Sequence, residues 1–133
     1  MNAFLIELEN QVGELARITE AIAAKDINIT GFSGSTCGDS GTILILTDDD
    51  ASTKAALQGV GCSFSEQEIV EVTLQHVPGT LAKAARRLAE AGVNIDAAVP
   101  TGMDESGTVV VGFVTNDPAK TRSILSTAGS AAG

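Results

Sequence analysis

One stretch of this chain recurs later in the same chain, and this repeat constrains the fold more than any other feature. Residues 13–54 match residues 79–120 without a gap. The identical residues of the first copy are Gly13, Leu15, Ala16, Ala23, Asn28, Ile29, Ser40, Gly41, Thr42 and Lys54. A position kept in both copies must satisfy one backbone geometry, so each copy tests the interpretation of the other. We therefore expect two units, residues 1–66 and 67–133, with two similar sites or one site between similar faces.

Size and composition narrow the class of protein. Units of about 65 residues bury little apolar surface alone, so we expect each to need its twin or a second chain. No apolar run approaches the roughly 18 residues of a membrane-spanning helix. The chain begins with a strand-like segment, residues 3–8, and no secretion signal is evident there. We expect a cytoplasmic protein with no membrane partner.

The charge argues against a nucleic-acid partner. The formal net charge is −9, and residues 1–66 hold ten acidic against three basic side chains. Binding a phosphate backbone needs clustered Lys and Arg, and the one tight cluster is Arg86-Arg87. Four Phe residues are the only aromatic residues, which leaves little on which single-stranded bases could stack.

The residues that carry most metal and catalytic chemistry are few. One His and two Cys lack the spacing of a zinc site, so we expect Cys37 and Cys62 to be reduced, packed thiols, with a disulfide left open. The run 48–50 of three Asp suits a helix cap, although a metal is the alternative. No nucleophile or carboxylate stands at a triad spacing from His76. We expect no catalytic residue, no metal and no cofactor.

Each copy predicts a strand, an amphipathic helix of about three turns and a hairpin of two strands. The first strands alternate apolar and polar residues, and then the apolar period becomes helical. The hairpins end in Ser-Gly, whose Gly we expect at positive φ. The apolar helix positions are Leu15, Ile18 and Ile22, and in the second copy Leu81, Ala85 and Leu88. We expect Asp26 and Gly92 to end these helices in a left-handed conformation.

A second helix and a fourth strand complete the first copy. The third strands, 42–46 and 108–111, are continuously apolar and so are predicted to be central. Asp and Asn residues cap the helix that follows each of them. Residues 62–65 read as a fourth strand, whereas the matching residues 128–133 are too small and flexible. The predicted order is β-α-β-β-α-β, an antiparallel sheet with helices on one face, and in the second copy an exposed or borrowed edge.

Two motifs resemble the ACT domain, a small regulatory module of enzymes of amino-acid metabolism. The segment 9–18 followed by Asp26-Ile27-Asn28-Ile29 carries the resemblance in the first copy. Pro78-Gly79-Thr80-Leu81 and Gly92-Val93-Asn94-Ile95 carry it in the second copy. The resemblance covers nearly the whole chain and implies an α+β fold of two ferredoxin-like, ACT-type units.

The resemblance also implies a binding site. ACT domains pair side by side, and a free amino acid lies where the first strand-to-helix loop of one domain faces the second strand of its neighbour. A helix N-terminus after Gly13 or Gly79 suits a carboxylate, and polar side chains suit the ammonium. The candidate ligand-binding residues are Asn10, Gln11, Val12, Gly13, Glu14, Leu15, Asn28 and Ile29, with His76, Val77, Pro78, Gly79, Thr80, Leu81, Asn94 and Ile95 in the second copy. Asp96 adds a further acidic group for the ammonium.

Departures from the motif leave alternatives open. Val12 replaces the usual Pro, and His76 stands where the first copy has Asn10. Two alternatives follow: the two sites differ in ligand, or one of them is empty. The loop glycines also serve a plain strand-to-helix turn, and Asn28 and Asn94 also serve turn backbone.

The sequence predicts a non-catalytic regulatory protein that binds a small amino acid and signals to a regulated enzyme or other protein target as a homodimer. The alternative is a structural or oligomerisation module without a functional small-molecule site. An enzyme that uses the same fold is the weakest alternative, because the catalytic constellations are missing.

Overall fold

The computed structural model consists of two compact units, Met1–Gln67 and Glu68–Gly133. It describes residues 1–103 and 105–132, and for residues 127–132 it describes the backbone alone. That residues 1–66 and 67–133 are separate domains stays a prediction. Within the described residues, no helix is both long and apolar enough to cross a membrane.

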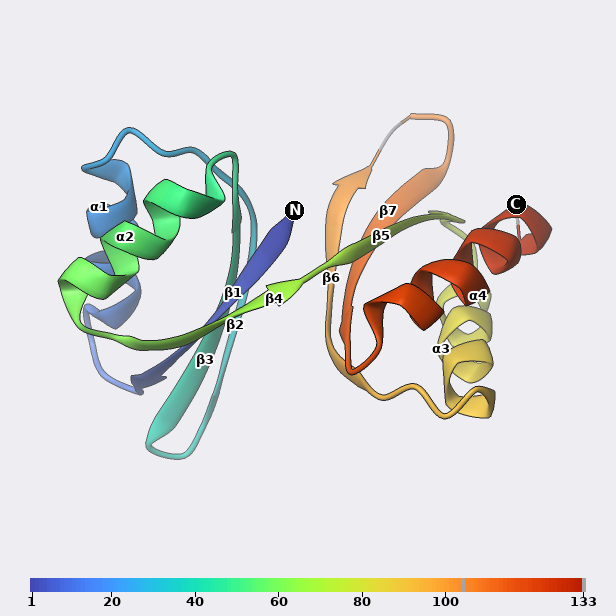
Figure 1. Ribbon diagram of the computed structural model, residues 1–133, viewed down its shortest axis with the longest axis horizontal. Helices are drawn as coiled ribbons and strands as arrows, with labels where there is room; N and C mark the ends of the chain where they lie inside the picture. Colours follow the sequence, from blue (N-terminus) through green and yellow to red (C-terminus); the bar gives the residue numbers. More distant parts are fainter. Residues whose placement is uncertain (104, 133) are drawn as a thin grey trace. The chain divides into compact units, whose positions relative to one another are not determined.

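The first unit has the predicted β-α-β-β-α-β order. Its sheet has the strand order β2-β3-β1-β4, and β3 pairs antiparallel with both β1 and β2. Figure 1 shows α1 and α2 together on one face of this sheet. The elements are β1 (Asn2–Glu9), α1 (Glu14–Ala23), β2 (Ile29–Cys37), β3 (Ser40–Thr47), α2 (Asp50–Val60) and β4 (Ser63–Glu68).

The second unit has a smaller sheet, of order β5-β7-β6, in the described part of the chain. Within the described residues this sheet has no fourth strand, and the second helix runs on to Ala132. That the last strand of this unit is weak or missing stays a prediction. The elements are β5 (Val70–Gln75), α3 (Thr80–Glu90), β6 (Ile95–Met103), β7 (Thr108–Thr115) and α4 (Pro118–Ala132).

Each unit has its own apolar core between sheet and helices. The first core contains fully buried Phe4, Ile18 and Leu57, and the ring of Phe4 lies 6.1 Å from that of Phe64. The second core contains Phe113 and Leu88. The prediction that the third strands are central is confirmed, because β3 and β7 each pair on both sides.

A buried pair of threonine hydroxyls ties the second helix to the sheet in both units. Thr47 and Thr53 lie 2.7 Å apart, and Thr115 and Thr121 lie 2.7 Å apart. Each pair bridges the end of the central strand and the first turn of the helix. Paired hydroxyls avoid the cost of a buried polar group without a partner.

The predicted helix limits agree with the structure. Asp49 caps α2 by accepting the Ser52 amide hydrogen at 3.0 Å, and Asp117 accepts that of Lys120 at 3.1 Å. The serine bonds hold the pKa of Asp49 below its ordinary value. Asp26 (φ 57°) and Gly92 (φ 76°) are left-handed, as expected after α1 and α3.

The prediction of an apolar helix face that packs on the core is wrong for its first position in each unit. Leu15 and Leu81 are 51% and 53% exposed, whereas Ile18, Ile22 and Leu88 are fully buried. Leu15 lies in the first turn of α1, where it borders a hollow and not the core. Helical spacing identifies an apolar face but does not show where the sheet that covers it ends.

In the structure, the two copies of the repeat do not align without gaps. Leu8 pairs with Gly41 and Leu74 pairs with Val109, so the offset grows from 66 (74 − 8) to 68 (109 − 41). One extra residue forms a bulge between Pro100 and Gly102, and the other lies in the hairpin after β6. The match of Ser40-Gly41-Thr42 to residues 106–108 is therefore not structural.

This gap corrects the prediction for the hairpin glycines. Gly107 takes the expected positive φ of 88°, whereas in the first hairpin Gly38 does so, with φ 64°. Gly41 lies inside β3, where an added Cβ would come within 2.9 Å of the Leu8 side chain. A side chain at position 41 would therefore displace the end of the Leu8 side chain.

Substitutions in α1 test which apolar residues of this helix belong to the core. We expect Ile18→Ala to lower the free energy of unfolding by about 2–5 kcal/mol, because it leaves a cavity in the core. Leu15→Ala is expected to change it by about 0.5 kcal/mol or less, as at exposed positions. Urea unfolding of both variants measures this difference. Equal losses would show that Leu15 belongs to the core.

Candidate ligand-binding groove

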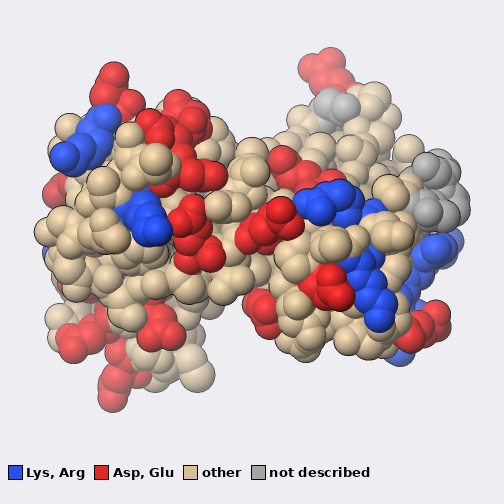
Figure 2. Space-filling view, in the orientation of Figure 1, with Lys and Arg blue, Asp and Glu red and all other residues tan. Residues whose placement is uncertain are grey.

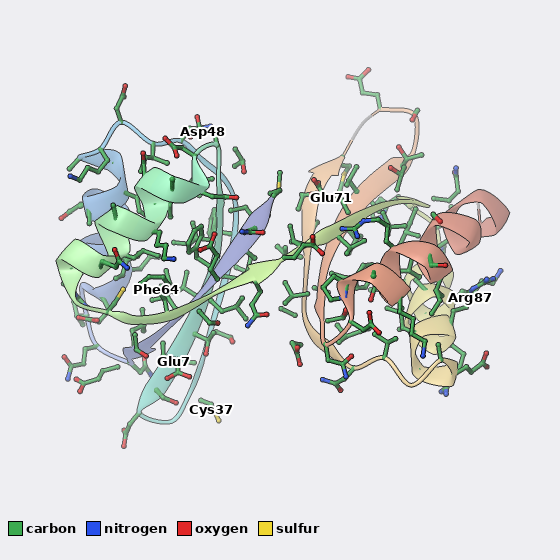
Figure 3. All side chains as sticks on the ribbon, viewed as in Figure 1. Glu7, Cys37, Asp48, Phe64, Glu71 and Arg87 are labelled. Atoms are coloured by element: carbon green, nitrogen blue, oxygen red, sulfur yellow. The ribbon has the colours of Figure 1, made fainter. Side chains whose placement is uncertain are left out.

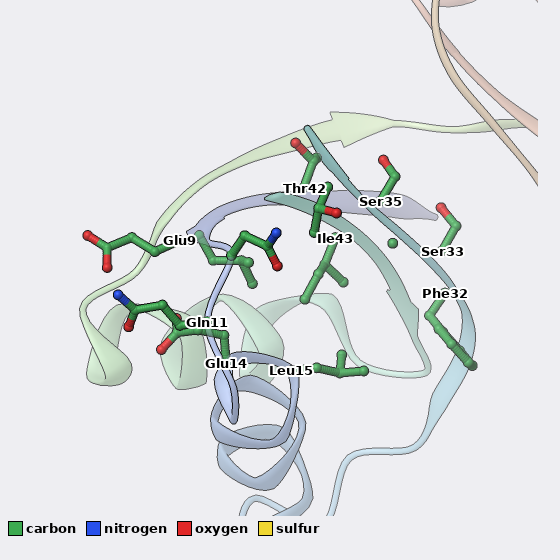
Figure 4. Close-up of a pocket in the computed structure, with 13 residues that line it drawn as sticks. Glu9, Gln11, Glu14, Leu15, Phe32, Ser33, Ser35, Thr42 and Ile43 are labelled. Atoms are coloured by element: carbon green, nitrogen blue, oxygen red, sulfur yellow. The ribbon is translucent and has the colours of Figure 1, made fainter. Parts of the chain in front are cut away.

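A groove of about 420 Å³ lies in the first unit between the β1–α1 loop and the edge strand β2. Figure 4 shows its wall from the loop residues Gln11 and Glu14 to Phe32. The residues that line it are Leu8, Glu9, Asn10, Gln11, Glu14, Leu15, Phe32, Ser33, Gly34, Ser35, Thr36, Thr42 and Ile43.

The sheet register decides which side chains face the helix side of the groove. Phe32 pairs with Ile45 and Gly34 with Ile43, and both isoleucines belong to the core under the helices. Successive residues of a strand point to opposite faces, so Ser33 and Ser35 face the other way. Figure 4 shows these two serine side chains directed away from Leu15. They therefore border the groove mainly with backbone.

Gly34 keeps the middle of this wall open. A Cβ at Gly34 would meet no atom closer than 3.8 Å, so a side chain there would extend into space. The register places Pro100 at the matching position of the second unit. Gly34 lies two residues after Phe32, which pairs with Ile45, and Pro100 lies two residues after Ala98, which pairs with Phe113. The second unit therefore carries a proline ring where the first has only hydrogen.

The start of α1 is an open anion-binding geometry. Gly13 is left-handed, with φ 91°, and no side chain caps the helix. By contrast, Asp49 caps α2. The amide groups of Leu15 and Ala16 lie in the first turn of α1, where a helix favours a negative group.

Carboxylates give the groove a negative charge. Glu14 accepts hydrogen bonds from the Arg17 guanidinium at 2.8 and 3.3 Å. These hydrogen bonds hold the pKa of Glu14 below its ordinary value, so Glu14 is anionic at neutral pH. Glu9 also lines the groove. Figure 2 shows acidic side chains over the first unit, whereas Lys and Arg gather over α3 and α4 of the second.

Asn10 fixes the loop to the neighbouring hairpin. Its side-chain amide donates to the Gly38 carbonyl at 3.0 Å, and its backbone N–H donates to the Asp39 carbonyl at 2.8 Å. The amide oxygen of Asn10 stays an acceptor beside the groove. Asn10 therefore positions the loop as well as offering a polar atom.

The other first-copy candidates do not line this groove. Val12 and Gly13 belong to the loop, and Val12 is fully exposed. The Asn28 backbone N–H donates to the Asp48 carboxylate at 3.1 Å, at the opposite end of α1. Ile29 lines an adjoining hollow of about 250 Å³, which shares Leu15, Phe32 and Ile43 with the groove.

The matching loop of the second unit is tied to itself. The Thr80 hydroxyl donates to the carbonyls of Gln75 at 2.6 Å and Val77 at 3.2 Å. Thr80 stands where the first unit has Glu14, and Gly79 is left-handed like Gly13. The remaining candidates of this loop, His76, Pro78 and Leu81, are exposed.

The second-strand candidates of this unit form a cluster of their own. The Asn94 side-chain amide donates to the Asp96 carboxylate at 2.8 Å, and the Asn94 backbone donates to Asn116 at 3.0 Å. Ile95 packs partly buried against the second core. The Asp96 carboxylate is thus already paired with Asn94.

Sequence reasoning missed residues 33–36 of β2 as part of the site. The signal is the continuation of small residues, Ser33-Gly34-Ser35-Thr36, up to the turn at Gly38. Leu8, Glu9, Thr42 and Ile43 were also missed as groove residues. Antiparallel pairing with β3 brings them beside the loop.

Both cysteines are free thiols. Cys37 is exposed on the β2–β3 hairpin, as Figure 3 shows, so the expectation of a packed thiol is wrong for it. Cys62 is half-buried, and burial raises the pKa of its thiol. Among the described residues, no group of three or more His, Cys, Asp or Glu side chains is placed to hold a metal ion.

Comparison with known proteins identifies the fold. No protein-family model matches the chain. No curated protein matches it. A protein from Bacteroides thetaiotaomicron matches with TM-score 0.79 and 24% identity, over 95% of this chain and 86% of that one. The ligand-free regulatory subunit of aspartate kinase from Thermus thermophilus matches with TM-score 0.68 and 22% identity, over 98% and 90%.

Part of a longer enzyme has a similar fold. E. coli aspartokinase III, solved in complex with lysine and aspartate, matches with TM-score 0.59 and 14% identity, over 98% of this chain and 31% of that one. The chain has the tandem ACT fold. Identities this low show the fold alone.

The Glu14–Arg17 pair gives a direct test of the groove charge. We expect Arg17→Gln to raise the pKa of Glu14 toward its ordinary value, because the hydrogen bonds that favour the carboxylate are lost. A carbon-13 NMR titration of the Glu14 carboxyl in both proteins measures this shift. An unchanged titration would show that the pair does not form in solution.

Proposed function

We propose that this protein is a non-catalytic regulator that binds a free amino acid in the groove of the first unit and signals its occupancy to a partner protein. The observation that supports it is the uncapped, left-handed start of α1 beside an anionic, half-apolar groove. A zwitterion needs a site for a negative group and a site for a positive group close together, and this groove offers both.

The chemistry of the groove suits the parts of an amino acid. The amides of the first turn of α1 suit the ligand carboxylate. The Glu14 carboxylate and the amide oxygen of Asn10 suit its ammonium. Leu15, Phe32 and Ile43 form the apolar wall for its side chain. E. coli aspartokinase III was solved with lysine and aspartate, and this supports the class of ligand.

The charge of the groove narrows the choice of amino acid further. Glu9 and Glu14 line the groove, and Arg17, which pairs with Glu14 at 2.8 Å, is not among the lining residues. A second carboxylate on the ligand would meet these like charges, which disfavour it. We therefore expect amino acids with neutral or cationic side chains to bind more tightly than aspartate and glutamate.

One ligand per chain follows from the differences between the units. Pro100 stands where Gly34 opens the first groove, and Thr80 replaces Glu14 and bonds to its own loop. The second unit keeps the turn at Gly79 but not the open wall or the carboxylate. We therefore assign a structural role, and no ligand, to the loop from His76 to Leu81.

The protein then acts by differential binding. A ligand shifts a partner equilibrium only if the liganded and empty forms bind the partner differently. We expect a cytoplasmic homodimer without cofactor, whose target is a regulated enzyme or another protein. The regulatory subunit of aspartate kinase from Thermus thermophilus has this fold, and this supports a regulatory role.

Filling the groove tests the proposal. We expect the wild-type protein to gain stability with at least one of the twenty amino acids, by about 2.7 kcal/mol when the ligand is at a hundred times its Kd. Gly34→Val places a side chain in the groove and should abolish this gain. Differential scanning fluorimetry against each amino acid measures it.

Gly102→Val is the matched control. Gly102 also lies in a strand, β6, with room for a Cβ, but in the second unit. This variant should respond to ligand like the wild type. The proposal is contradicted if no amino acid stabilises the folded wild-type protein, or if Gly34→Val responds normally.

The second candidate function is a structural module that assembles through its sheet edges. In the described part of the chain no strand lies beside β5, and this favours this candidate. The Gly34→Val variant also separates the two candidates, because assembly does not use the groove. A stable oligomer with no response to any amino acid would support the structural module.

A further inference from the structure

The hollow of about 250 Å³ beside the groove is lined almost wholly by apolar side chains. It shares three of its lining residues with the groove, so the two spaces adjoin. The residues that line the hollow are Leu15, Thr19, Ile29, Phe32, Ile43 and Ile45. Figure 4 shows three of them, with Phe32 across from Leu15 and Ile43 close to Leu15. The lining thus consists of five apolar side chains and one hydroxyl.

The hollow has a fixed floor and an exposed rim. Ile43 and Ile45 belong to the first core, and Ile29 packs against that core. At the rim, Leu15 is 51% exposed and Phe32 is 66% exposed. A ligand side chain that covers this rim removes apolar surface from water, which favours binding.

Helix geometry sets how far that side chain must reach. Leu15 and Thr19 are four residues apart in α1, which corresponds to about 6 Å along the helix axis. In the proposed function the ligand carboxylate lies at the first amides of α1, near Leu15. A side chain as long as that of leucine or methionine covers much of the distance to Thr19, whereas the methyl group of alanine does not.

The far end of the hollow disfavours polar groups. The Thr19 hydroxyl donates to the Leu15 carbonyl at 2.8 Å, so its hydrogen is used inside α1. The other two residues at this end, Ile29 and Ile45, have apolar side chains. A charged or amide group placed there would lose its water without equivalent hydrogen bonds, which costs free energy.

We propose that the ligand is an amino acid with a large apolar side chain, such as leucine, isoleucine, methionine or phenylalanine, and that the hollow holds this side chain. The inference rests on the proposed function and narrows it to one class of amino acid. Thr19 and Ile29, which line the hollow and not the groove, are then specificity-determining residues.

Three amino acids test the inference in the wild-type protein. Asparagine has nearly the shape of leucine but carries an amide, and alanine lacks the part that fills the hollow. Each buried CH₂ group strengthens binding by about fourfold, so we expect leucine to bind at least about tenfold more tightly than either. Isothermal titration calorimetry at neutral pH measures the three dissociation constants.

The outcomes separate this inference from the proposed function. If alanine or asparagine binds as tightly as leucine, the inference is overturned, while the proposed function stands because an amino acid binds. If no amino acid binds, both are overturned.

A variant that fills the hollow tests where the side chain lies. Thr19→Phe places a ring at the far end, and we expect the advantage of leucine over alanine to fall to about threefold or less. The dissociation constant of alanine should change by less than about threefold, because the start of α1 is untouched. An unchanged advantage of leucine in this variant overturns the inference.

Ala85→Phe is the matched control. Ala85 lies six residues after Gly79, as Thr19 lies six residues after Gly13, and both residues are half-buried. This variant should keep the wild-type preference for leucine, because it changes the second unit alone. If Thr19→Phe does not fold, the comparison of leucine with asparagine in the wild type still decides.

Discussion

The turn from β1 into α1 depends on Gly13, and the candidate site depends on that turn. Its φ of 91° is one that residues with a side chain rarely adopt. The left-handed turn starts α1 without a capping side chain and leaves its first amides beside the groove. Gly79 repeats this geometry, with φ 93°, so both units inherit the same helix start. The position is therefore needed for the fold before it is needed for a ligand.

The two units keep this frame but differ at a few positions that decide the chemistry. Gly34 opens one wall and Pro100 fills its counterpart, while Glu14 lines the groove and Thr80 bonds to its own loop. A duplicated unit can thus keep one fold while its two copies differ in chemistry.

The sequence predicts the order of elements well, because strand and helix periods and caps are local properties. The repeat supplied a second test of each element. It also misled, since the identical Ser-Gly-Thr at 40–42 and 106–108 hid two inserted residues that only the strand register reveals. Leu15 was assigned to the core because periodicity cannot distinguish a core from the rim of a groove. Ser33 to Thr36 were missed because their place beside the loop depends on sheet pairing.

The most direct test of the account is a nitrogen-15 NMR titration of the labelled protein with the amino acids, singly or in pools. The account predicts that the amide signals of Leu15, Ala16 and Gly34 move with saturation, while those of Leu81 and Ala82 in the second loop stay fixed. Movement centred on the second loop, or no movement with any amino acid, would contradict the account.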